Sequence, residues 1–581
     1  MYRSDSFMVN RKYQRKLVWT EAEKQRLIDS ILRGYPIPLI LLAERVHMYG
    51  NGKYEILDGL QRLNAIFGFI ENQFAVSEEW FDLEQLARAK QLAEQGEFVA
   101  ADAGARRLSA QSCAAFLDYQ LAVTIYPAMD EDTTVEVFGR INSGGKQLSD
   151  QERRQAGVAG GFGSLVRKIS SELRGDSSAE VLELSKMPEI SIDSARAPQK
   201  YGLKADDIVW CRQGILRSSD LRDSEDEELV ADILASILLD EPFPRSKEAL
   251  DELYSKGTER WDRINTGLTD ELSAKVSADV KMTFSLVRET IEAVNPQPNA
   301  LRNIVSSSNN PAKSAFYAVF MAFYRLVVDE GRLPQDCRAI VQALGGLQGK
   351  LTTSRHYTTT EDRKRNIDLT VGLIQGSFVH REASALRHGP GLTLDFENSL
   401  RRSRIETARY EFKQGVLPLE GDRKPQDSLY DRIIRTICAI ANVGPEADGF
   451  IHIGVADKRE DAEKIRQIDQ VNFVEIAGHC VVGIDREARQ LGESLDDYVR
   501  RITDKIRNSQ LSEPLRLQVL SQIDVIEFRA LSVVRIRIPS QQEVSFVGSL
   551  AYAREGSQTI DVADQRKVLA MNRLFEGKER N

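Results

Sequence analysis

Cysteine is scarce and scattered in this chain, which has five in 581 residues. Because no two of them form a CxxC pair, the sequence supports neither a disulfide framework nor a structural zinc site. Long apolar runs are missing too, and IPLILLA, among the longest, is too short to cross a bilayer. The N-terminal stretch MYRSDSFMVNRKYQRK lacks the apolar core of a signal peptide. We therefore expect a reduced, cytoplasmic chain that does not associate with a membrane.

An excess of positive charge is also absent. The net charge is −9, which argues against a protein that coats nucleic acid along its whole surface. A local basic groove remains compatible with this value, because phosphate recognition depends on where the cations lie. Two stretches are locally basic, RKYQRK near the N-terminus and LRRSRIETARYEFK beyond residue 400. The chain is longer than one hydrophobic core normally supports, so we expect about two to four domains.

The pattern of apolar residues changes twice along the chain. Residues 1–160 mix helices and strands: TEAE is a capping box that predicts a helix start, and LILLAERV and KYEILD predict a strand hairpin. Residues 161–390 show 3.6-residue periodicity and predict a helical region, with KMPEISIDSARAPQKYG as a loop. RHGPGLTLDFENSLRRS is expected to be a linker or docking segment, and residues 395–570 have the texture of a compact α/β domain. The predicted fold class is multidomain α+β.

Three polar clusters in residues 1–160 point to an anion site. A glycine after a strand lets the backbone approach a ligand, a helix N-terminus offers free N–H groups, and an arginine adds a bidentate fork for phosphate. A strand-to-helix corner with aspartate as N-cap is also common, and GxxxxGK[ST] is absent, so the residues alone leave both interpretations open. The candidate nucleotide-binding residues are Arg11, Gln14, Arg15, Asp58, Gly59, Gln61, Arg62, Asn142, Gly144, Gly145 and Lys146.

The segments RKYQRKLVW, IDSILRGYPIP, ILDGLQRL and FGRINSGGKQLSDQERR resemble, in order and spacing, the GmrSD-type family of bacterial restriction proteins. The resemblance covers about residues 5–160 and implies a ParB-like α+β domain. The family's D-G-Q-Q-R signature is tied to nucleotide binding and hydrolysis, which implies these roles for Asp58, Gly59, Gln61 and Arg62. Leu60 departs from the signature, because the family usually has glutamine there. A leucine neither orients water nor bonds a phosphate, so we expect nucleotide binding with slow turnover.

Glu411 and Lys413 lie two apart on a predicted strand and so point to the same face. A carboxylate beside a lysine suits metal-dependent phosphodiester cleavage, in which carboxylates hold a divalent ion and the lysine stabilises developing charge. Glu406 and Asp457 are candidate further carboxylates, and oxygen ligands of this type suit Mg²⁺ or Mn²⁺. The alternative is an ordinary surface pair on an exposed strand.

The segments YEFKQG, AIANVGPEADGFIHIGVAD, RIRIPS and AYAREGSQT resemble the AlbA-type domain of the Schlafen family over about residues 400–565. In its nuclease members two glutamates five apart and a later aspartate form the active site, which implies that role for Glu406, Glu411 and Asp457. Many bacterial relatives are known only as nucleic-acid binding, so binding without cleavage stays open. His479-Cys480 is expected to be a buried strand pair. Basic residues that track a phosphate backbone, or form a solvated face, are Arg401, Arg402, Arg404, Arg409, Lys413, Arg535, Arg537 and Arg554.

Together the resemblances imply a bacterial anti-phage effector in which nucleotide binding or hydrolysis controls metal-dependent cleavage of DNA or RNA. One alternative is a non-catalytic nucleic-acid-binding regulator with a nucleotide-controlled, ParB-like clamp. A second is an interaction protein in which both sites have decayed. The expected partners are nucleic acid, a nucleoside triphosphate and, in a homo-oligomer, a second copy of the chain. The candidate catalytic residues are Asp58, Gln61, Arg62, Glu406, Glu411, Lys413 and Asp457, and the metal ligands among them are Glu406, Glu411 and Asp457.

Overall fold

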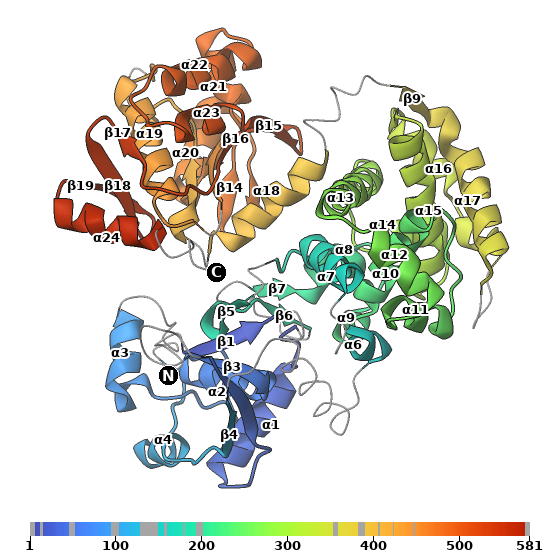
Figure 1. Cartoon of the computed structure of the whole chain (residues 1–581), viewed down its shortest axis with the longest axis horizontal. Coiled ribbons are helices and arrows are strands. Elements are labelled where there is room, and N and C mark those ends of the chain that lie inside the picture. Colours follow the sequence, from blue (N-terminus) through green and yellow to red (C-terminus); the bar gives the residue numbers. More distant parts are fainter. Residues whose placement is uncertain are drawn as a thin grey trace. The chain divides into compact units, whose positions relative to one another are not determined.

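The computed structural model of the chain divides into two compact units, Met1–Arg381 and Glu382–Asn581 (Figure 1). No helix in the described part of the chain is long and apolar enough to cross a membrane. The structure describes residues 6–11, 16–45, 53–94, 104–127, 149–155, 160–177, 181–192, 202–352, 358–380, 390–404, 407–421, 423–445 and 448–575.

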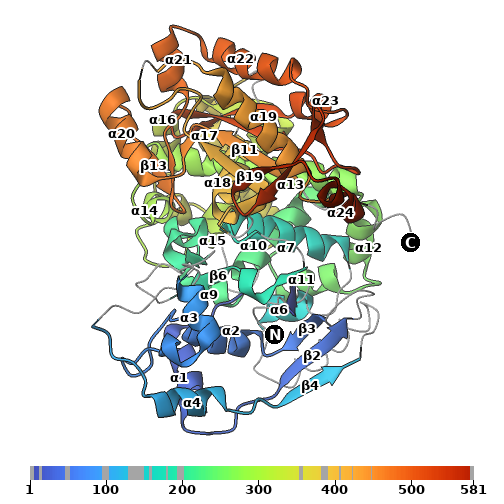
Figure 2. The same ribbon diagram turned by 90° about the vertical axis from the view of Figure 1, so that its left-hand side faces the viewer.

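A five-stranded sheet with the order β4-β2-β3-β1-β5 begins the first unit, and Figure 2 shows its strands β3, β2 and β4 side by side. The predicted hairpin is confirmed, because β2 and β3 pair antiparallel, and β4 and β1 flank them in parallel pairing. β5 pairs antiparallel with β1 from beyond residue 160, so the sheet draws on residues outside the predicted first domain, and that boundary stays a prediction. The strands are β1 (Phe7–Asn10), β2 (Ile40–Arg45), β3 (Lys53–Asp58), β4 (Val123–Tyr126) and β5 (Val181–Glu183).

Two capped helices of the first unit begin where the sequence predicts. α1 starts after Thr20, whose hydroxyl accepts from the Glu23 N–H at 3.2 Å while the Glu23 carboxylate reaches back to the Thr20 N–H at 3.0 Å. Ser149 and Glu152 form the same reciprocal pair at the start of α6. The early helices are α1 (Glu21–Leu32), α2 (Leu60–Ile70), η2 (Leu83–Gln85), α3 (Ala87–Glu94), α4 (Ala110–Leu117) and α6 (Asp150–Gln155).

Helices dominate the remainder of the first unit, as predicted. Its centre contains edge-to-face aromatic contacts, with the Trp210 ring 5.1 Å from Phe284 and 5.5 Å from Phe316. The predicted loop KMPEISIDSARAPQKYG contains the short strand β6, which pairs in parallel with β7, a strand that begins at the last residue of the loop. The elements are α7 (Gly161–Arg174), η3 (Leu184–Lys186), β6 (Glu189–Ser191), β7 (Gly202–Lys204), η4 (Ala205–Asp207), α8 (Val209–Arg212), α9 (Ser218–Arg222), α10 (Glu225–Leu238), α11 (Lys247–Tyr254), α12 (Glu259–Gly267), α13 (Asp270–Glu292), α14 (Ala300–Val305), α15 (Lys313–Tyr324), η5 (Arg325–Asp329), β8 (Arg332–Pro334), α16 (Cys337–Ala343), η6 (Leu347–Gly349), α17 (Thr360–Ile374), η7 (Gln375–Ser377) and β9 (Phe378–His380).

The predicted linker RHGPGLTLDFENSLRRS is instead largely a helix, α18 (Pro390–Arg402), of the second unit. Phe396 and Leu400, four residues apart, are fully buried in one apolar cluster with Val481 and Phe528. The proline does not prevent this helix, because it occupies the first position, where its missing N–H is not needed. The linker alternative is therefore wrong, and the segment docks on its own unit.

Three small sheets and the helices around them make up the second unit. β10 lies at the edge of the first sheet, β10-β11-β16-β15, and pairs in parallel with β11. The others have the orders β12-β14-β13 and β17-β18-β19, so the predicted α+β class is confirmed. The elements are η9 (Thr407–Arg409), β10 (Tyr410–Lys413), α19 (Asp427–Ala441), β11 (Gly449–Ile453), β12 (Val455–Ala456), α20 (Arg459–Asp469), β13 (Val474–Ile476), β14 (His479–Val481), α21 (Asp485–Leu491), α22 (Leu495–Arg507), α23 (Leu515–Leu520), β15 (Ile523–Phe528), β16 (Leu531–Ile538), β17 (Phe546–Val547), β18 (Leu550–Glu555), β19 (Gln558–Val562) and α24 (Gln565–Phe575).

Candidate functional site

The corner between β3 and α2 depends on a glycine. Gly59 is the N-cap of α2 with φ of 100°, and no side chain caps this helix end. A Cβ at Gly59 would lie 2.5 Å from the Ile40 Cδ1 atom, so another residue would meet both backbone strain and a clash. The Gly59 N–H donates to the Asp58 carboxylate at 2.7 Å. Asp58 is therefore not the N-cap, and the alternative of an ordinary aspartate-capped helix is wrong.

Arg62 turns back from α2 toward this corner. Its guanidinium donates to the Asp58 carboxylate at 2.8 Å and to the Leu39 carbonyl at 3.0 Å. The Asp58 side chain is 38% exposed, whereas the Arg62 side chain is 15% exposed. The buried Nε–H of Arg62 has no hydrogen-bond partner among the described residues. A solvent-accessible carboxylate thus lies beside an arginine with a spare donor, which suits a polar, charged ligand.

Gln61 binds backbone groups that come from the segment after RKYQRK. Its amide nitrogen donates to the Lys16 carbonyl at 2.6 Å, and its oxygen accepts from the Val18 and Trp19 N–H groups, each at 3.3 Å. The side chain therefore positions residues 16–19 against α2. Its predicted part in hydrolysis stays a prediction.

Leu60, the residue that departs from the family signature, points into the core. It is buried in one apolar cluster with Ile40, Leu42 and Ile56. A side chain at this position consequently contacts strands β2 and β3.

Arg11 contacts a carboxylate that the sequence did not single out. Its guanidinium donates to the Asp176 carboxylate at 2.7 Å and to the Asp176 carbonyl at 2.5 Å. Asp176 follows α7, so this contact joins the RKYQRK segment to the helical region. It belongs to a buried ionic cluster formed by Arg11, Lys16, Arg174, Asp176, Asp226 and Glu227.

The ionic cluster is arranged around Asp226 and Arg174. The Asp226 carboxylate accepts from Lys16 at 3.0 Å and from Arg174, which also pairs with Asp176 and Glu227, each at 3.0 Å. Burial alone would raise the pKa of Asp226 and of Asp176. The positive charge of Arg174 outweighs burial at both carboxyl groups and lowers both pKa values. Lys16 adds to this effect at Asp226, and Arg11 adds to it at Asp176. All three carboxylates are matched by cations in a site closed to water.

Parts of both predicted sites lie outside the described residues. This applies to seven of the predicted side chains, whose roles stay predictions. They are Gln14, Arg15, Asn142, Gly144, Gly145, Lys146 and Glu406.

In the second unit, Glu411 is held between two cations. Strand β10 places Glu411 and Lys413 on one face, as predicted, and the Lys413 ammonium contacts one carboxylate oxygen of Glu411. Arg554, from β18, donates to the other oxygen at 2.9 Å. The Arg554 side chain is only 1% exposed and also donates to the Tyr410 carbonyl at 3.1 Å. The interpretation of Glu411 and Lys413 as a surface pair is therefore incomplete, because a buried arginine fixes the carboxylate from behind.

Asp457 lies within electrostatic reach of the same lysine. A contact with His479 is the largest cause that lowers the Asp457 pKa, and Lys413 contributes as well. The Asp457 oxygen is 3.5 Å from the His479 Nδ1 atom, which is longer than an ordinary hydrogen bond. The other ring nitrogen of His479 lies 2.9 Å from the Ser403 hydroxyl, and the centre of the Phe412 ring lies 4.1 Å from that of the His479 ring. The charge of Lys413 thus acts on Glu411, which it contacts, and more weakly on Asp457.

The oxygen donors of this place fit a hard divalent ion. Glu411 and Asp457 are the carboxylates that Mg²⁺ or Mn²⁺ prefers, although Glu411 would have to share its oxygens with Lys413 and Arg554. The described residues contain no group of three or more metal-ligating side chains, and the third predicted ligand, Glu406, is not among them. His479 and Cys480 lie on β14 with Cys480 buried, which confirms that they are strand residues.

Several arginines predicted to track phosphate are paired with carboxylates instead. Arg535 pairs with Asp524 at 2.8 Å, and Arg537 pairs with Asp448 at 2.5 Å. Arg554 fits neither the phosphate-tracking nor the solvated-face interpretation, because it is buried against Glu411. The acids that pair with them stand far along the chain or on a neighbouring strand, so a count of local basic residues does not reveal them.

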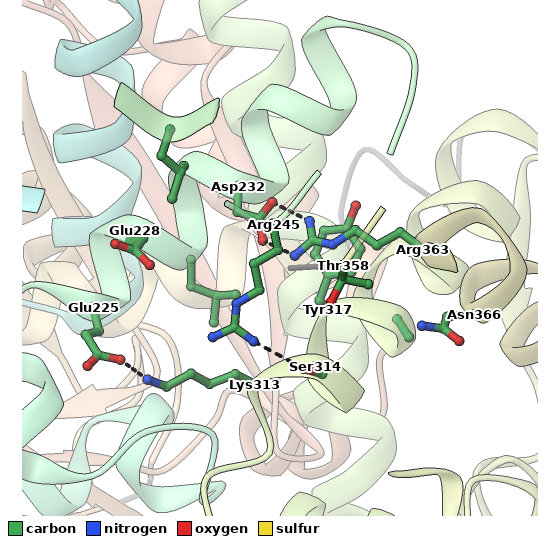
Figure 3. A pocket seen from close by; sticks show the side chains of 13 residues that line it. Glu225, Glu228, Asp232, Arg245, Lys313, Ser314, Tyr317, Thr358, Arg363 and Asn366 are labelled. Atoms are coloured by element: carbon green, nitrogen blue, oxygen red, sulfur yellow. Dashed lines mark hydrogen bonds and ion pairs between the residues drawn. The ribbon is translucent and has the colours of Figure 1, made fainter. Parts of the chain in front are cut away.

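The helical region contains a small pocket beside α10, α15 and α17 (Figure 3). Two ion pairs lie within its lining: Arg363 forks onto Asp232, and Lys313 contacts Glu225. The Arg363 guanidinium also lies 4.0 Å from the centre of the Tyr317 ring. The interior is about 50 Å³, which holds a few waters. No residue that the sequence singled out lines this pocket, and its ion pairs read as structural.

Comparison with known proteins gives a partial match for each end of the chain. Residues 2–158 match the family described as the N-terminal domain of the GmrSD restriction endonuclease, and residues 406–564 match the family described as Schlafen, AlbA_2. No curated protein and no solved structure gives a match. Both resemblances inferred from the sequence are confirmed: this chain joins a region similar to the GmrSD N-terminal domain to a region similar to the Schlafen AlbA_2 domain.

Proposed function

We propose that the chain is a nucleic-acid-acting defence protein whose second unit cuts nucleic acid with a divalent metal, under the control of a nucleotide bound in its N-terminal domain. The matched families support a role in restriction and in contact with nucleic acid. The observation that carries the cleavage proposal is the geometry around Glu411: Lys413 contacts the carboxylate on the same strand face, and Arg554 fixes it from the buried side. A carboxylate with an ammonium beside it is suited to a cation and a phosphodiester.

Each side chain of this site has a distinct part in the proposal. Glu411 and Asp457, together with Glu406, would hold Mg²⁺ or Mn²⁺, and the bound ion would supply Lewis-acid activation of the phosphate. Lys413 stabilises negative charge that develops on the phosphate oxygens. Arg554 fixes the position of Glu411 from the buried side, and His479 orients Asp457. The chain itself therefore provides charge stabilisation and a rigid carboxylate.

A cleavage assay tests the proposal directly. Purified full-length chain is incubated with single-stranded DNA, double-stranded DNA or RNA, with Mn²⁺ or EDTA, and with or without each nucleoside triphosphate. We expect cleavage that requires the metal and changes in rate when the right nucleotide is added. If no nucleotide binds or changes the rate, the coupling between the two regions is wrong.

A binding-only regulator is the second candidate, because the Glu411 carboxylate is already neutralised by Lys413 and Arg554. On this alternative the second unit holds a nucleic-acid strand without cutting it. Strand retention in a gel-shift assay with no cleavage in any metal would favour it.

Replacing Arg62 by alanine should weaken nucleotide binding by about tenfold or more, because the change removes a charged donor beside Asp58. The measurement is titration calorimetry of the full-length chain with each nucleoside triphosphate. Arg26→Ala is the matched control, since Arg26 is exposed on α1 and donates only to the Ala22 carbonyl. Equal affinity in the two variants would contradict a site at Arg62.

Restoring the family glutamine through Leu60→Gln should lower the free energy of unfolding by about 1–3 kcal/mol, because it buries an amide in an apolar cluster. We expect no gain in nucleotide hydrolysis, since position 60 faces the core. Thermal melting and a phosphate-release assay measure both effects. Leu60→Met, which conserves volume, is the control. Faster hydrolysis with unchanged stability would show that this side chain reaches the nucleotide.

A further inference from the structure

The second unit contains a cavity that is not lined by the carboxylates of the proposed cleavage site. Its volume is about 380 Å³, within the range of about 300–1,000 Å³ typical of small-molecule sites. The walls come from the loop after α20, from the start of β13, from the first turns of α21 and from the turn between β15 and β16. Glu411, Lys413 and Asp457 do not line it. The cavity is therefore available for a separate ligand.

Two unpaired arginines stand at this cavity. Arg489 and Arg529 are both exposed, and neither side chain makes an ion pair or a hydrogen bond with any other residue that the structure describes, although the Arg529 guanidinium lies 5.4 Å from the centre of the Phe528 ring. The acidic residue in the lining, Asp485, is already occupied, because its carboxylate accepts from the Ser532 N–H at 2.7 Å and from the Ser532 hydroxyl at 2.8 Å. The free charge of the cavity is thus positive.

The buried wall adds a donor without an acceptor. Arg486 is 1% exposed and is fixed by Asp469 at 2.8 Å and by the Gln414 carbonyl at 2.7 Å. Its buried Nε–H has no partner among the described residues. Several other buried arginines, among them Arg62 and Arg554, have the same unpartnered Nε–H, so this donor alone does not indicate a ligand. The two exposed guanidinium groups of Arg489 and Arg529 are the donors that an anionic oxygen would meet in this cavity.

Part of the remaining lining is apolar, beside the polar residues Gln470 and Asn472. Phe473, Val474 and Leu531 contribute side chains that suit a flat, weakly polar group. We propose that this cavity binds a nucleotide-sized phosphate monoester, with the phosphate on Arg489 and Arg529 and the base against the apolar wall. The same chemistry has two sources, a free nucleoside monophosphate and the 5′-phosphate end of a nucleic-acid strand. The site goes beyond the proposed function, because it requires neither cleavage nor the N-terminal nucleotide.

Titration calorimetry of the full-length chain with adenosine 5′-monophosphate tests the site. We expect saturable binding that Arg489→Ala/Arg529→Ala weakens by about tenfold for each arginine removed. Arg432→Ala is the matched control, because Arg432 is exposed on α19, lies outside the cavity lining and makes no described ion pair. Both target arginines are exposed, so thermal melting of the double variant should match wild type. Absence of binding, or equal affinity in the double variant and Arg432→Ala, would overturn the proposal.

Competition experiments identify the source of the phosphate. A short DNA strand with a 5′-phosphate should displace adenosine 5′-monophosphate, whereas the same strand with a 5′-hydroxyl should not. Tighter binding of the phosphorylated strand than of the free nucleotide assigns the site to strand ends, and the reverse order assigns it to free nucleotide. Displacement by the 5′-hydroxyl strand to the same degree would overturn phosphate recognition. All these measurements are made in EDTA, so their outcome does not depend on whether the second unit cleaves nucleic acid.

Discussion

The Asp226→Asn variant should lower the free energy of unfolding of the first unit by about 3–5 kcal/mol, because it removes one partner from a buried ion cluster. Asp226 is fully buried and accepts from both Lys16 and Arg174. The substitution preserves the size of the side chain but leaves the buried cations Lys16 and Arg174 with one carboxylate fewer, so the cluster carries an excess positive charge. Chemical or thermal unfolding followed by circular dichroism measures the loss.

Asp29→Asn is the control for this prediction. Asp29 pairs with Arg33 on the surface of α1, where the two side chains are 41% and 59% exposed. A pair of this kind contributes at most about 0.5 kcal/mol, so the control should melt close to wild type. A loss in Asp226→Asn as small as in the control would contradict the view that the cluster fixes the RKYQRK segment to α7 and α10.

The same cluster should make the first unit sensitive to acid. The pKa values of Asp176 and Asp226 are lowered in the folded chain, by Arg174 above all against the opposing effect of burial. Carboxylates with lowered pKa stabilise the fold above their unfolded pKa of about 3.9 and lose that contribution as the pH falls through the folded values. Wild type should therefore lose more stability than Asp226→Asn below about pH 4. Melting temperatures of the two proteins, measured in parallel across this pH range, test the prediction. Equal losses in wild type and in Asp226→Asn would refute it.

Local patterns in the sequence predicted elements that are stabilised locally. The capping boxes at Thr20 and Ser149 and the β2–β3 hairpin depend on residues a few positions apart. The pairing of β5 with β1 joins Leu182 to Val9, and such long-range pairing has no local signal. At α18 the local composition was misleading, because its glycines and proline suggest a linker. Phe396 and Leu400 are nevertheless buried in a core formed by strands from elsewhere in the unit.

The candidate sites divide in the same way. The period-two alternation of a strand predicted that Glu411 and Lys413, two positions apart, share one face, and the structure agrees. Their counterpart Arg554 stands 143 residues along the chain, so it was grouped with surface cations. Arg11 is similar, because its acceptor Asp176 is 165 residues away. Charge complementarity across such separations is decided by tertiary packing, which a single sequence does not display.

The Glu411→Gln variant should lose at least about a hundredfold in metal-dependent cleavage while its affinity for nucleic acid stays near wild type. Glutamine keeps an oxygen that accepts from Arg554, so the buried guanidinium is not stranded, but it lacks the negative charge that a divalent ion needs. The measurements are cleavage rates in Mn²⁺ and equilibrium binding in EDTA, on the same DNA and RNA substrates.

Glu555→Gln provides the matched control for charge, because Glu555 is exposed on β18, one residue after Arg554, and makes no described ion pair. Its cleavage and binding should both equal wild type. If Glu411→Gln cuts as fast as Glu555→Gln, the site assignment is wrong and the cations around Glu411 are structural. If wild type binds strands but never cuts in any metal, the binding-only regulator is correct, and Lys413→Ala should then weaken binding where Glu411→Gln does not. Comparing Glu411→Gln with Glu555→Gln thus distinguishes a carboxylate that binds a catalytic metal from one that only holds Lys413 and Arg554 in place.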